Sequence, residues 1–518
     1  MKTTRRGFLQ AAAATGALLP FQRNCASVRA LRIFDDTVSL AQLAADPLRP
    51  QIHLLPKRNW MNDPNGPIFW KGRYHMFFQY NPNAAVWGDM HWAHASSPDM
   101  IHWNHLPVAL APTPGGYDSE GCFSGSAVDD GGTATIIYTG VKTVAPQEAT
   151  LRDGTRNFLE VQCLATAVDD ELGSWKKLKE PVLLPPKGPR LTGFRDPCLW
   201  QEGKHWYMGV GSGIRGEGGC VLLYRSADLR AWEYVHPLAK GRRNEKTAAD
   251  PVDTGEMWEC PDFFALGGKH VLLYSTERKV YWEAGDFDTK ELVFHAEAHG
   301  ELDHGAFYAP KSQLDAKGRR ILWGWIPETR PELEFSAAGW AGCMSLPRAL
   351  SLGADGTLQM EVVPEVAALR ETEKSMRAEG VGRDAHIMPL QKMDLGSGAA
   401  EIEVRWGAKP FHLVITDGAQ DIFKMAIRVE ASGQTMQIGE GAAAVNLPAG
   451  ADSEHAGRIL LDGSVVECFV DERLAWTTRA YHGARSHLGV EVPFSELVAL
   501  KSLKAWPLRA ISPDRLTS

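Results

Sequence analysis

The stretch Gly66-Pro-Ile-Phe-Trp-Lys-Gly-Arg-Tyr-His-Met-Phe-Phe-Gln-Tyr80 contains a short apolar run, a tight turn with glycine, and a second run rich in aromatic residues. This order is typical of two antiparallel strands joined by a hairpin. Similar units recur as far as about Glu328 without being identical. The five copies begin at Gly66, Gly125, Asp196, Asp262 and Pro310.

Successive copies are spaced by roughly 50 to 70 residues, the scale of one four-stranded propeller blade with its loops. Few stretches in this region have helical periodicity. We therefore predict an all-β fold in which residues 50–350 form a five-bladed β-propeller. The second strands of the units are predicted at Tyr74–Tyr80, Thr135–Tyr138, Trp206–Val210, Val271–Tyr274 and Ile321–Trp325.

The pattern changes after the fifth unit. An apolar run at Val362–Leu369 contains Pro364 and has helical spacing, so residues 351–375 are predicted to be a linker with a short helix. Residues 376–518 contain short alternating strands separated by Gly and Asp turns, which indicates a C-terminal β-sandwich. Its strands are predicted at Ala400–Trp406, Phe411–Thr416, Phe423–Val429, Arg458–Leu461 and Val465–Val470.

The composition is that of a globular protein. A chain of 518 residues exceeds the size at which one core stops growing, so two domains are expected. A formal net charge of -8 argues against nucleic acid or an anionic membrane as the main partner. The eight Cys residues occur singly, so we expect neither a disulfide framework nor a zinc site, but buried thiols.

The first 30 residues are predicted to be a twin-arginine export signal. Thr4-Arg5-Arg6-Gly7-Phe8-Leu9 precedes an apolar run from Ala11 to Leu19 that is too short to span a membrane. The mature protein is then periplasmic or extracellular. The alternative is an amphipathic N-terminal helix that stays attached.

Three acidic motifs occur at the entry to a first strand of a unit: Asn62-Asp63-Pro64, Arg195-Asp196-Pro197 and Glu259-Cys260-Pro261. The first strands of propeller blades line the central axis, so residues far apart in sequence can converge there. Two converging carboxyl groups are what glycoside hydrolysis requires. Each motif also has a structural interpretation: Asp63 in a β-turn, Asp196 in an ion pair, and Glu259 as a solvated charge.

Further motifs resemble those of glycoside hydrolase family 32, which includes invertases, inulinases and levanases. The resemblance extends from about His53 to Leu508. Besides the acidic motifs it rests on Phe77-Phe-Gln-Tyr-Asn-Pro82, Trp87-Gly-Asp-Met-His-Trp92, Phe123-Ser-Gly-Ser126, Gly339-Trp-Ala-Gly-Cys-Met-Ser-Leu-Pro-Arg348 and Val465-Val-Glu-Cys-Phe-Val-Asp471. The family's fold, a five-bladed propeller followed by a β-sandwich, agrees with the units counted above.

The resemblance implies a retaining β-fructofuranosidase that releases terminal fructose from sucrose or fructans. It assigns Asp63 as nucleophile, Glu259 as acid and base, and Asp196 as the stabiliser of the transition state, with Arg195 keeping Asp196 ionised. It implies that the fructosyl ring is bound by Asn62, Gln79, Trp87, Phe123, Ser124 and Arg195.

No cofactor and no metal are expected. Gly211-Ser-Gly-Ile-Arg-Gly216 matches a dinucleotide-binding glycine pattern, but a turn and a strand follow it instead of a helix, so we predict a hairpin.

Several alternatives stay open. They are an exo-levanase or exo-inulinase, a fructosyltransferase or an arabinose-specific enzyme of the same fold, and an inactive lectin-like sugar binder. The sequence does not determine the choice between sucrose, inulin and levan, the ratio of hydrolysis to transfer, the signal cleavage site, the oligomeric state or the role of the sandwich.

Overall fold

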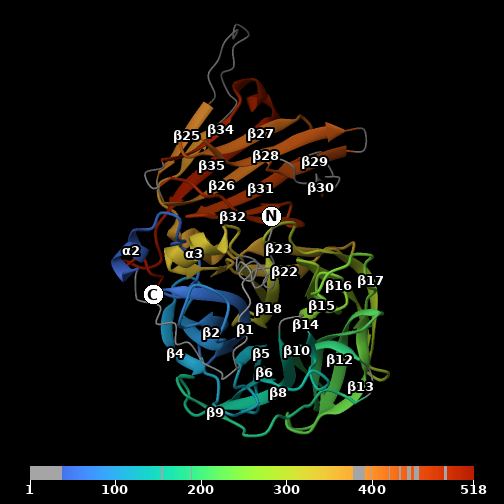
Figure 1. The fold of residues 1–518 in the computed structure, drawn as a ribbon. Helices are drawn as coiled ribbons and strands as arrows, with labels where there is room; N and C mark the ends of the chain where they lie inside the picture. The colour runs from blue at the N-terminus through green and yellow to red at the C-terminus, as the bar shows by residue number, and fades with distance from the viewer. Residues whose placement is uncertain are drawn as a thin grey trace, which may run out of the picture.

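A computed structural model describes residues 38–517 apart from nine short stretches, and its elements are nearly all strands. The stretches left out are 153–155, 188–189, 377–390, 397, 419, 431–432, 440–444, 448–453 and 484–486. The predicted signal at residues 1–30 lies outside the described residues. The chain forms two bodies, with the propeller in the lower part of Figure 1 and the sandwich above it.

Five antiparallel sheets surround the propeller axis, each with its first strand innermost, as the five repeated units predict (Figure 1). The first blade contains β1 (Asn59–Trp70), β2 (Arg73–Asn81), β3 (His91–Ser97) and β4 (Asn104–Leu110). The second contains β5 (Gly121–Asp129), β6 (Ala134–Thr143), β7 (Leu151–Arg152), β8 (Asn157–Ala167) and β9 (Trp175–Lys177). The third contains β10 (Leu191–Glu202), β11 (His205–Ile214), β12 (Gly218–Ser226) and β13 (Glu233–Lys240).

The last two blades complete the ring. The fourth contains β14 (Glu259–Leu266), β15 (Lys269–Thr276), β16 (Lys279–Asp288) and β17 (Val293–Glu301). The fifth contains β18 (Tyr308–Leu314), β19 (Arg320–Ile326), β21 (Cys343–Met344), β22 (Arg348–Leu352) and β23 (Leu358–Val362). After the short helix α3 (Glu332–Ala338), β20 (Trp340–Ala341) pairs in parallel with β1, so a segment between β19 and β22 of the fifth blade is hydrogen-bonded to the first blade. This pairing closes the ring.

The fifth blade corrects the predicted domain boundary. Strands β22 and β23 belong to its sheet, so the propeller continues to Val362 and the boundary predicted at residue 350 falls inside a blade. The predicted linker helix is present as a short 3-10 helix, η1 (Pro364–Leu369). The connection between the two bodies is therefore shorter than the sequence suggested.

The sandwich consists of two six-stranded sheets that cover one apolar core, as predicted. Alternation along β26 places Ile402 and Val404 in this core and leaves Arg405 exposed. One sheet contains β24 (Lys374–Met376), β26 (Ala399–Trp406), β31 (His455–Asp462), β32 (Val465–Val470), β33 (Leu474–Arg479) and β35 (Leu500–Leu508). The other contains β25 (Gln391–Gly396), β27 (Phe411–Thr416), β28 (Asp421–Glu430), β29 (Gly433–Ile438), β30 (Val445–Asn446) and β34 (Leu488–Val492).

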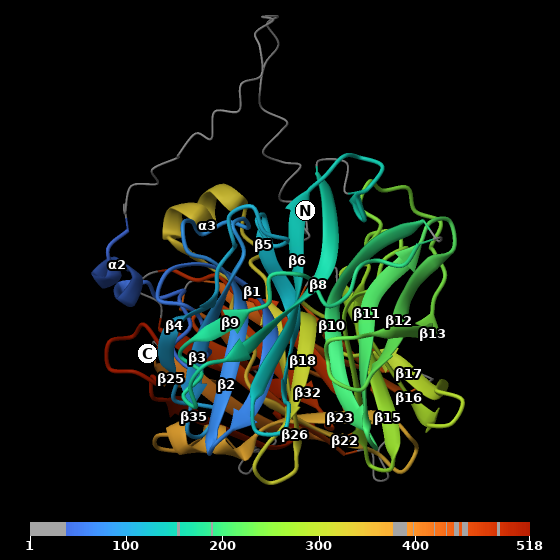
Figure 2. The ribbon, with the colours of Figure 1, turned by 90° about the horizontal axis from the view of Figure 1, so that it is seen from below.

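Four elements of the described part lie outside these sheets. Besides α3 and η1 they are α2 (Leu40–Ala45), which precedes the propeller, and η2 (Phe494–Ala499), which leads into β35. All seven cysteines of the described part are buried, as predicted. In the view of Figure 2, the sandwich strands, orange and red, lie behind the blue-to-yellow strands of the propeller.

A buried network of charges joins the two bodies. His53, which precedes the first blade, contacts Asp462 at 2.7 Å through Nδ1 and Glu467 at 3.0 Å through Nε2, and all three side chains are fully buried. Arg348 of the fifth blade binds Glu467 at 2.6 Å and Asp303 at 2.9 Å. Burial opposes the charge on His53, but Asp462 and Glu467 raise the pKa of His53 to about 9.

This network predicts a pH-dependent stability. A histidine pKa raised from 6.5 to about 9 contributes roughly 3 kcal/mol below pH 6.5, and this contribution is lost as pH rises through 9. His53→Gln is therefore expected to lower the unfolding free energy at pH 6 by about 3 kcal/mol, and much less at pH 9.5. Urea denaturation at both pH values measures this, with the exposed His102→Gln as the control. Equal losses at both pH values would show that His53 is not charged in the folded protein.

Candidate active site

All five inner strands carry a β-bulge at the same place. The strand register shifts between Met61 and Pro64 in the first blade, and corresponding shifts occur in the other four. A bulge leaves residues unpaired and re-aims their side chains. The residues left unpaired at the bulges are Asn62-Asp63, Ser124, Asp196-Pro197, Cys260-Pro261 and Ala309-Pro310.

Three of these bulges place a non-glycine residue in the left-handed region. Asp196 has φ 62°, Cys260 has φ 48° and Ala309 has φ 53°. Such backbone is unfavourable for a side chain with a Cβ and concentrates at functional sites. The three residues occupy equivalent positions, so the strained backbone is a shared feature of these blades. It turns each side chain toward the propeller axis.

The residues at the bulges form one buried cluster. Asp63 accepts hydrogen bonds from Asn62 Nδ2 at 3.0 Å and Ser124 Oγ at 2.6 Å. The Cys260 thiol lies 3.4 Å from Asp63 Oδ2 and 3.4 Å from Asp196 Oδ2. Asp196 Oδ2 also accepts from the backbone N–H of Cys260 at 3.1 Å. Cys260 therefore connects two carboxylates that come from different blades.

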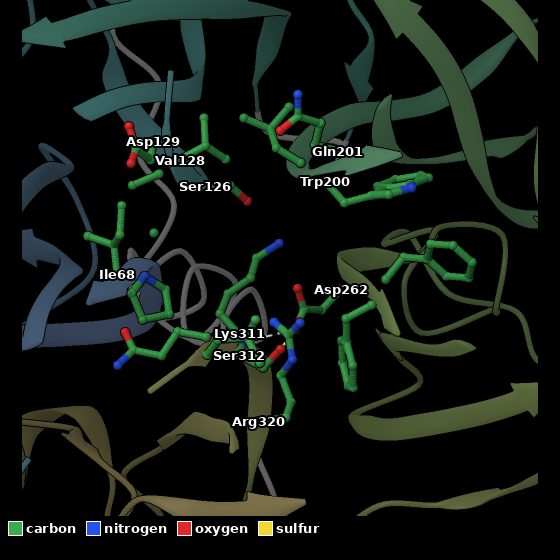
Figure 3. A pocket seen from close by; sticks show the side chains of 18 of the residues that line it. Ile68, Ser126, Val128, Asp129, Trp200, Gln201, Asp262, Lys311, Ser312 and Arg320 are labelled. Atoms are coloured by element: carbon green, nitrogen blue, oxygen red, sulfur yellow. Dashed lines mark hydrogen bonds between the residues drawn. The ribbon is translucent and has the colours of Figure 1, made fainter. Parts of the chain in front are cut away.

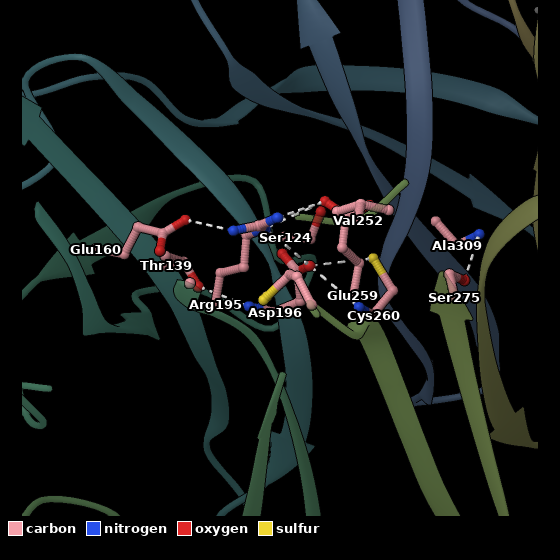
Figure 4. Close-up of polar contacts among 12 residues, drawn as sticks. Ser124, Thr139, Glu160, Arg195, Asp196, Val252, Glu259, Cys260, Ser275 and Ala309 are labelled. Atoms are coloured by element: carbon pink, nitrogen blue, oxygen red, sulfur yellow. Dashed lines mark hydrogen bonds and ion pairs between the residues drawn. The ribbon is translucent and has the colours of Figure 1, made fainter. Parts of the chain in front are cut away.

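A second set of side chains lies one residue before the bulge residues of the third, fourth and fifth blades. Arg195 and Glu259 occupy equivalent places in the third and fourth blades and bind each other at 2.8 Å (Figure 4). Tyr308, the equivalent residue of the fifth blade, donates its hydroxyl hydrogen to Glu259 Oε2 at 2.8 Å. Burial, and then the neighbouring Glu259, raise the pKa of Tyr308 well above its ordinary value, so this phenol stays protonated. The two contacts fix the orientation of the Glu259 carboxyl group.

Arg195 is the cation at the centre of the site. Its Nη1 binds Glu160 Oε1 at 2.9 Å, and its Nε lies 3.8 Å from Asp196 Oδ2. Burial opposes its charge, but the carboxylates of Glu160, Glu259 and Asp196 raise the pKa of Arg195 well above its ordinary value. The hydrogen bonds of Arg195 thus go to Glu160 and Glu259, whereas the sequence suggested Asp196 as its main partner.

The predicted ring-binding residues surround this cluster. Asn62, Gln79, Phe123 and Ser124 are buried, and Trp87 is half-buried with its ring edge-on to Phe123 at 5.8 Å. Gln79 donates to the carbonyl of Cys122 at 2.8 Å. Within the described part of the chain, Gln79 Oε1 and Trp87 Nε1 are buried and have no hydrogen-bond partner. These two atoms can serve a hydroxyl-rich ligand.

Two structural alternatives from the sequence are wrong. Asp63-Pro64-Asn65-Gly66 is not a turn, because Pro64 and Asn65 pair with Phe78 and Phe77 inside β1. Gly66 is required there since it has φ 43° and a Cβ would lie 2.7 Å from the backbone of Ala127 in the next blade. Glu259 is not a solvated charge, because it is buried and only 4 % exposed.

Two other expectations are settled by the strand pairing. The glycine-rich Gly211–Gly216 segment forms the hairpin between β11 and β12, as predicted. The three acids do not occupy identical places, since Asp63 and Asp196 are bulge residues and Glu259 precedes the bulge residue Cys260.

Sequence analysis missed Glu160, Cys260 and Tyr308. Aligning the units on the residue before each Pro or Gly would have found Cys260 and Tyr308, because they occupy the same places as Asp196 and Arg195. Glu160 lies on β8, in the middle of a blade, and no pattern in the sequence marks it. It also accepts a hydrogen bond from the Phe194 backbone at 2.7 Å.

No metal ligand set and no membrane-spanning helix belong to the part of the chain described. No three or more His, Cys, Asp or Glu side chains are grouped there to hold a metal ion. Every helix described is too short or too polar to cross a bilayer.

Comparison with known proteins identifies the family. Residues 53–362 match the glycosyl hydrolases family 32 N-terminal domain, and residues 365–507 match the family 32 C-terminal domain. The chain is 37% identical to a raffinose invertase from Escherichia coli over 486 residues, covering 87% of this chain and 94% of that protein. It is 39% identical to a sucrose-6-phosphate hydrolase from Escherichia coli over 378 residues, covering 70% of this chain and 72% of that protein.

A solved structure agrees with this match. A GH32 beta-fructofuranosidase from Bombyx mori superimposes with a TM-score of 0.73 at 29% identity, covering 90% of this chain and 95% of that one. The family matches together span the propeller and the sandwich. The protein therefore belongs to glycoside hydrolase family 32 and is a glycoside hydrolase.

Proposed function

We propose that the protein releases terminal β-D-fructofuranosyl residues from sucrose or fructans with net retention of configuration. The observation that carries this proposal is the convergence of Asp63, Asp196 and Glu259, from three blades, in one buried polar cluster. A retaining glycosidase needs one carboxylate as nucleophile and a second carboxyl group as acid and then base. The similarity to a raffinose invertase supports the choice of a fructosyl substrate.

Asp63 is suited to be the nucleophile. Its carboxylate accepts hydrogen bonds from the Asn62 amide and the Ser124 hydroxyl, both neutral donors that stabilise the charged form and fix its direction. Attack of Asp63 on the anomeric carbon forms a covalent fructosyl-enzyme while the bond to the leaving oxygen breaks. Water then attacks the anomeric carbon from the face that the leaving oxygen occupied, opposite Asp63, and displaces the Asp63 carboxylate. The product therefore has the original configuration.

Glu259 is suited to transfer the proton. It donates a proton to the leaving oxygen in the first step and accepts one from the attacking water in the second. Tyr308 and Arg195 hold its two oxygens, so the carboxyl group is oriented before substrate binds. Such preorganisation lowers the cost of reaching the reactive geometry.

Asp196 is suited to face the positive charge that develops on the sugar ring. It is fully buried and is held by the Cys260 backbone, while its own N–H donates to Thr139 Oγ1 at 2.9 Å. A fixed carboxylate in a buried site stabilises a nearby cation more than it would in water. It can also accept hydrogen bonds from fructosyl hydroxyl groups.

Trp87 is proposed to cover the apolar face of the sugar. Trp87→Ala is expected to raise KM for sucrose about tenfold because it removes the stacking surface, whereas Trp87→Phe should retain most of the affinity. Initial rates over a range of sucrose concentrations measure this. A tenfold fall in kcat without a change in KM would instead assign Trp87 to the transition state.

A chromatogram of released products tests the proposed function. The mature protein is incubated with equal masses of sucrose, raffinose, inulin and levan, with Glu259→Gln as the control. Rapid glucose and fructose from sucrose indicate an invertase, and fructose mainly from the polymers indicates an exo-fructanase. Sucrose 6-phosphate is included because one similar protein is a sucrose-6-phosphate hydrolase. Binding of these sugars without any release would contradict hydrolysis and support a lectin-like protein.

We further propose that the chain is exported. The support is the paired Arg5-Arg6 before Phe8 and the short apolar run after it. Arg5→Lys together with Arg6→Lys is the test in the native host, followed by fractionation. Intact precursor and activity should then remain in the cytosolic fraction; unchanged export of the variant would reject the twin-arginine route.

A further inference from the structure

A cavity lies on the propeller axis beyond the catalytic cluster. All five inner strands contribute to its lining, through the residues that follow the bulges, such as Ser126, Asp262 and Lys311 (Figure 3). Strands rise about 3.3 Å per residue, so lining residues three positions after Asp63 or Asp196 are roughly 10 Å further along the strands. The cavity has a volume of about 430 Å³, enough for a small ligand.

The cavity contains buried polar groups with no partner in the described part of the protein. Gln313 is 5 % exposed, and neither its amide nitrogen nor its amide oxygen forms a hydrogen bond. The Nε of Arg320 and the Nε1 of Trp200 are also buried and unpaired. Native proteins satisfy nearly all such groups, because an unpaired buried donor or acceptor destabilises the fold. These groups together offer three donors and one acceptor to a bound molecule.

The charges of the cavity are mixed. Lys311, 1 % exposed, donates to the carbonyl of Pro261 at 2.6 Å, and Arg320 stacks on Phe264 at 4.7 Å. Asp262 is buried beside them and accepts hydrogen bonds from Ser312 N at 2.8 Å and Ser312 Oγ at 2.6 Å. Asp129 and Glu202 add further negative charge to the lining. Acidic groups oppose a bound anion, and the cations oppose a bound metal or ammonium ion.

Aromatic residues supply flat apolar walls. Trp200 packs against Tyr207 at 5.6 Å and Phe263 at 4.9 Å, so its ring is held in place. Trp200, Phe263 and Phe264 all line the cavity. Rigid aromatic rings next to planar amides and charged groups suit a ligand that has both apolar faces and many hydroxyl groups.

We propose that this cavity is a second sugar site, which binds a neutral monosaccharide independently of the catalytic site. A sugar hydroxyl both donates and accepts, so it can pair with the Gln313 amide, Arg320 and Asp262 at once. It carries no charge that Lys311 or Asp262 would repel. The site does not depend on the proposed hydrolysis of sucrose, since none of its residues belongs to the catalytic cluster.

Fluorine NMR of the full chain labelled with 5-fluorotryptophan tests this site separately from the catalytic one. The resonances of Trp200 and Trp87 are assigned with Trp200→Phe and Trp87→Phe, and the probes are fructose, glucose and inorganic phosphate. The Trp200 resonance is expected to shift saturably with fructose or glucose and to stay unchanged with phosphate. No shift with either sugar would overturn the proposal, as would a shift with phosphate alone.

The Gln313→Leu variant provides the decisive comparison. It is expected to weaken the sugar-induced shift of Trp200 at least tenfold and to leave the shift of Trp87 unchanged. Gln313→Leu keeps the shape of the side chain and removes two unpaired atoms, so its Tm without sugar should equal or exceed that of the wild type. An exposed Gln420→Leu in the sandwich is the matched control. A Trp200 shift that survives in Gln313→Leu would show that the signal is transmitted from the catalytic site, and would overturn the proposal.

The two proposals fail in different ways. Loss of the proposed hydrolysis would appear as absent products in the chromatogram, whatever the Trp200 resonance does. Gln313→Leu is expected to keep the wild-type initial rate at low sugar concentration, because Gln313 has no contact with the catalytic carboxylates.

Discussion

Asp63→Asn is expected to lower kcat on sucrose by about 10⁴-fold or more, because the amide cannot form the covalent fructosyl-enzyme. The fold should be unaffected, since the amide oxygen can still accept the hydrogen bond from Asn62 Nδ2 and the amide nitrogen can donate to Ser124 Oγ. Steady-state rates on sucrose, with the unfolding transition measured in parallel, check the prediction. KM should change far less than kcat.

A matched control separates chemistry from charge. Asp286→Asn removes a carboxylate from the exposed ion pair with Lys269 and is expected to leave kcat unchanged. A variant Asp63→Asn that retains a tenth or more of the wild-type kcat would exclude Asp63 as the nucleophile. Mass spectrometry of the wild type quenched during turnover should find one fructosyl unit attached to the peptide that contains Asp63.

Glu259→Gln is expected to lower kcat on sucrose by about 10² to 10⁴-fold, because the leaving oxygen must depart without a proton. The loss should be smaller for a fructoside with a good leaving group, which needs less protonation. Added azide should restore turnover by attacking the fructosyl-enzyme without a general base. The product would then be a fructosyl azide with the configuration of the substrate.

The control for this variant is Glu297→Gln, an exposed residue paired with Lys269. If Glu259→Gln lost activity but gained nothing from azide or from a better leaving group, Glu259 would be a residue that positions Arg195. The hydrogen bonds from Arg195 and Tyr308 make this comparison necessary, because a carboxyl group held by both could also act through them.

Much of the fold could be predicted because its determinants are local and repeated. Five strand-turn-strand units predicted five blades, and alternating segments such as Ala400–Trp406 predicted the sandwich. The boundary at residue 350 was wrong because β22 and β23 follow a long connection after β19 and contain no aromatic residue that would mark them as blade strands. No pattern in the sequence predicted the contacts of His53 with Asp462 and Glu467, since His53 is more than 400 residues away from both of them.

The sequence by itself determined the repeated blade unit and the family, and it predicted Asp63, Asp196 and Glu259 as the three acids, because short motifs such as Asn62-Asp63-Pro64 carry this information. Only the tertiary structure decided which groups surround those acids. Bulges at equal places on five strands bring Ser124 and Cys260 to Asp63, and bring Glu160 and Tyr308 to the Arg195–Glu259 pair. The physical reason is ring closure: contacts across the axis depend on how all five sheets pack, and no local pattern encodes them.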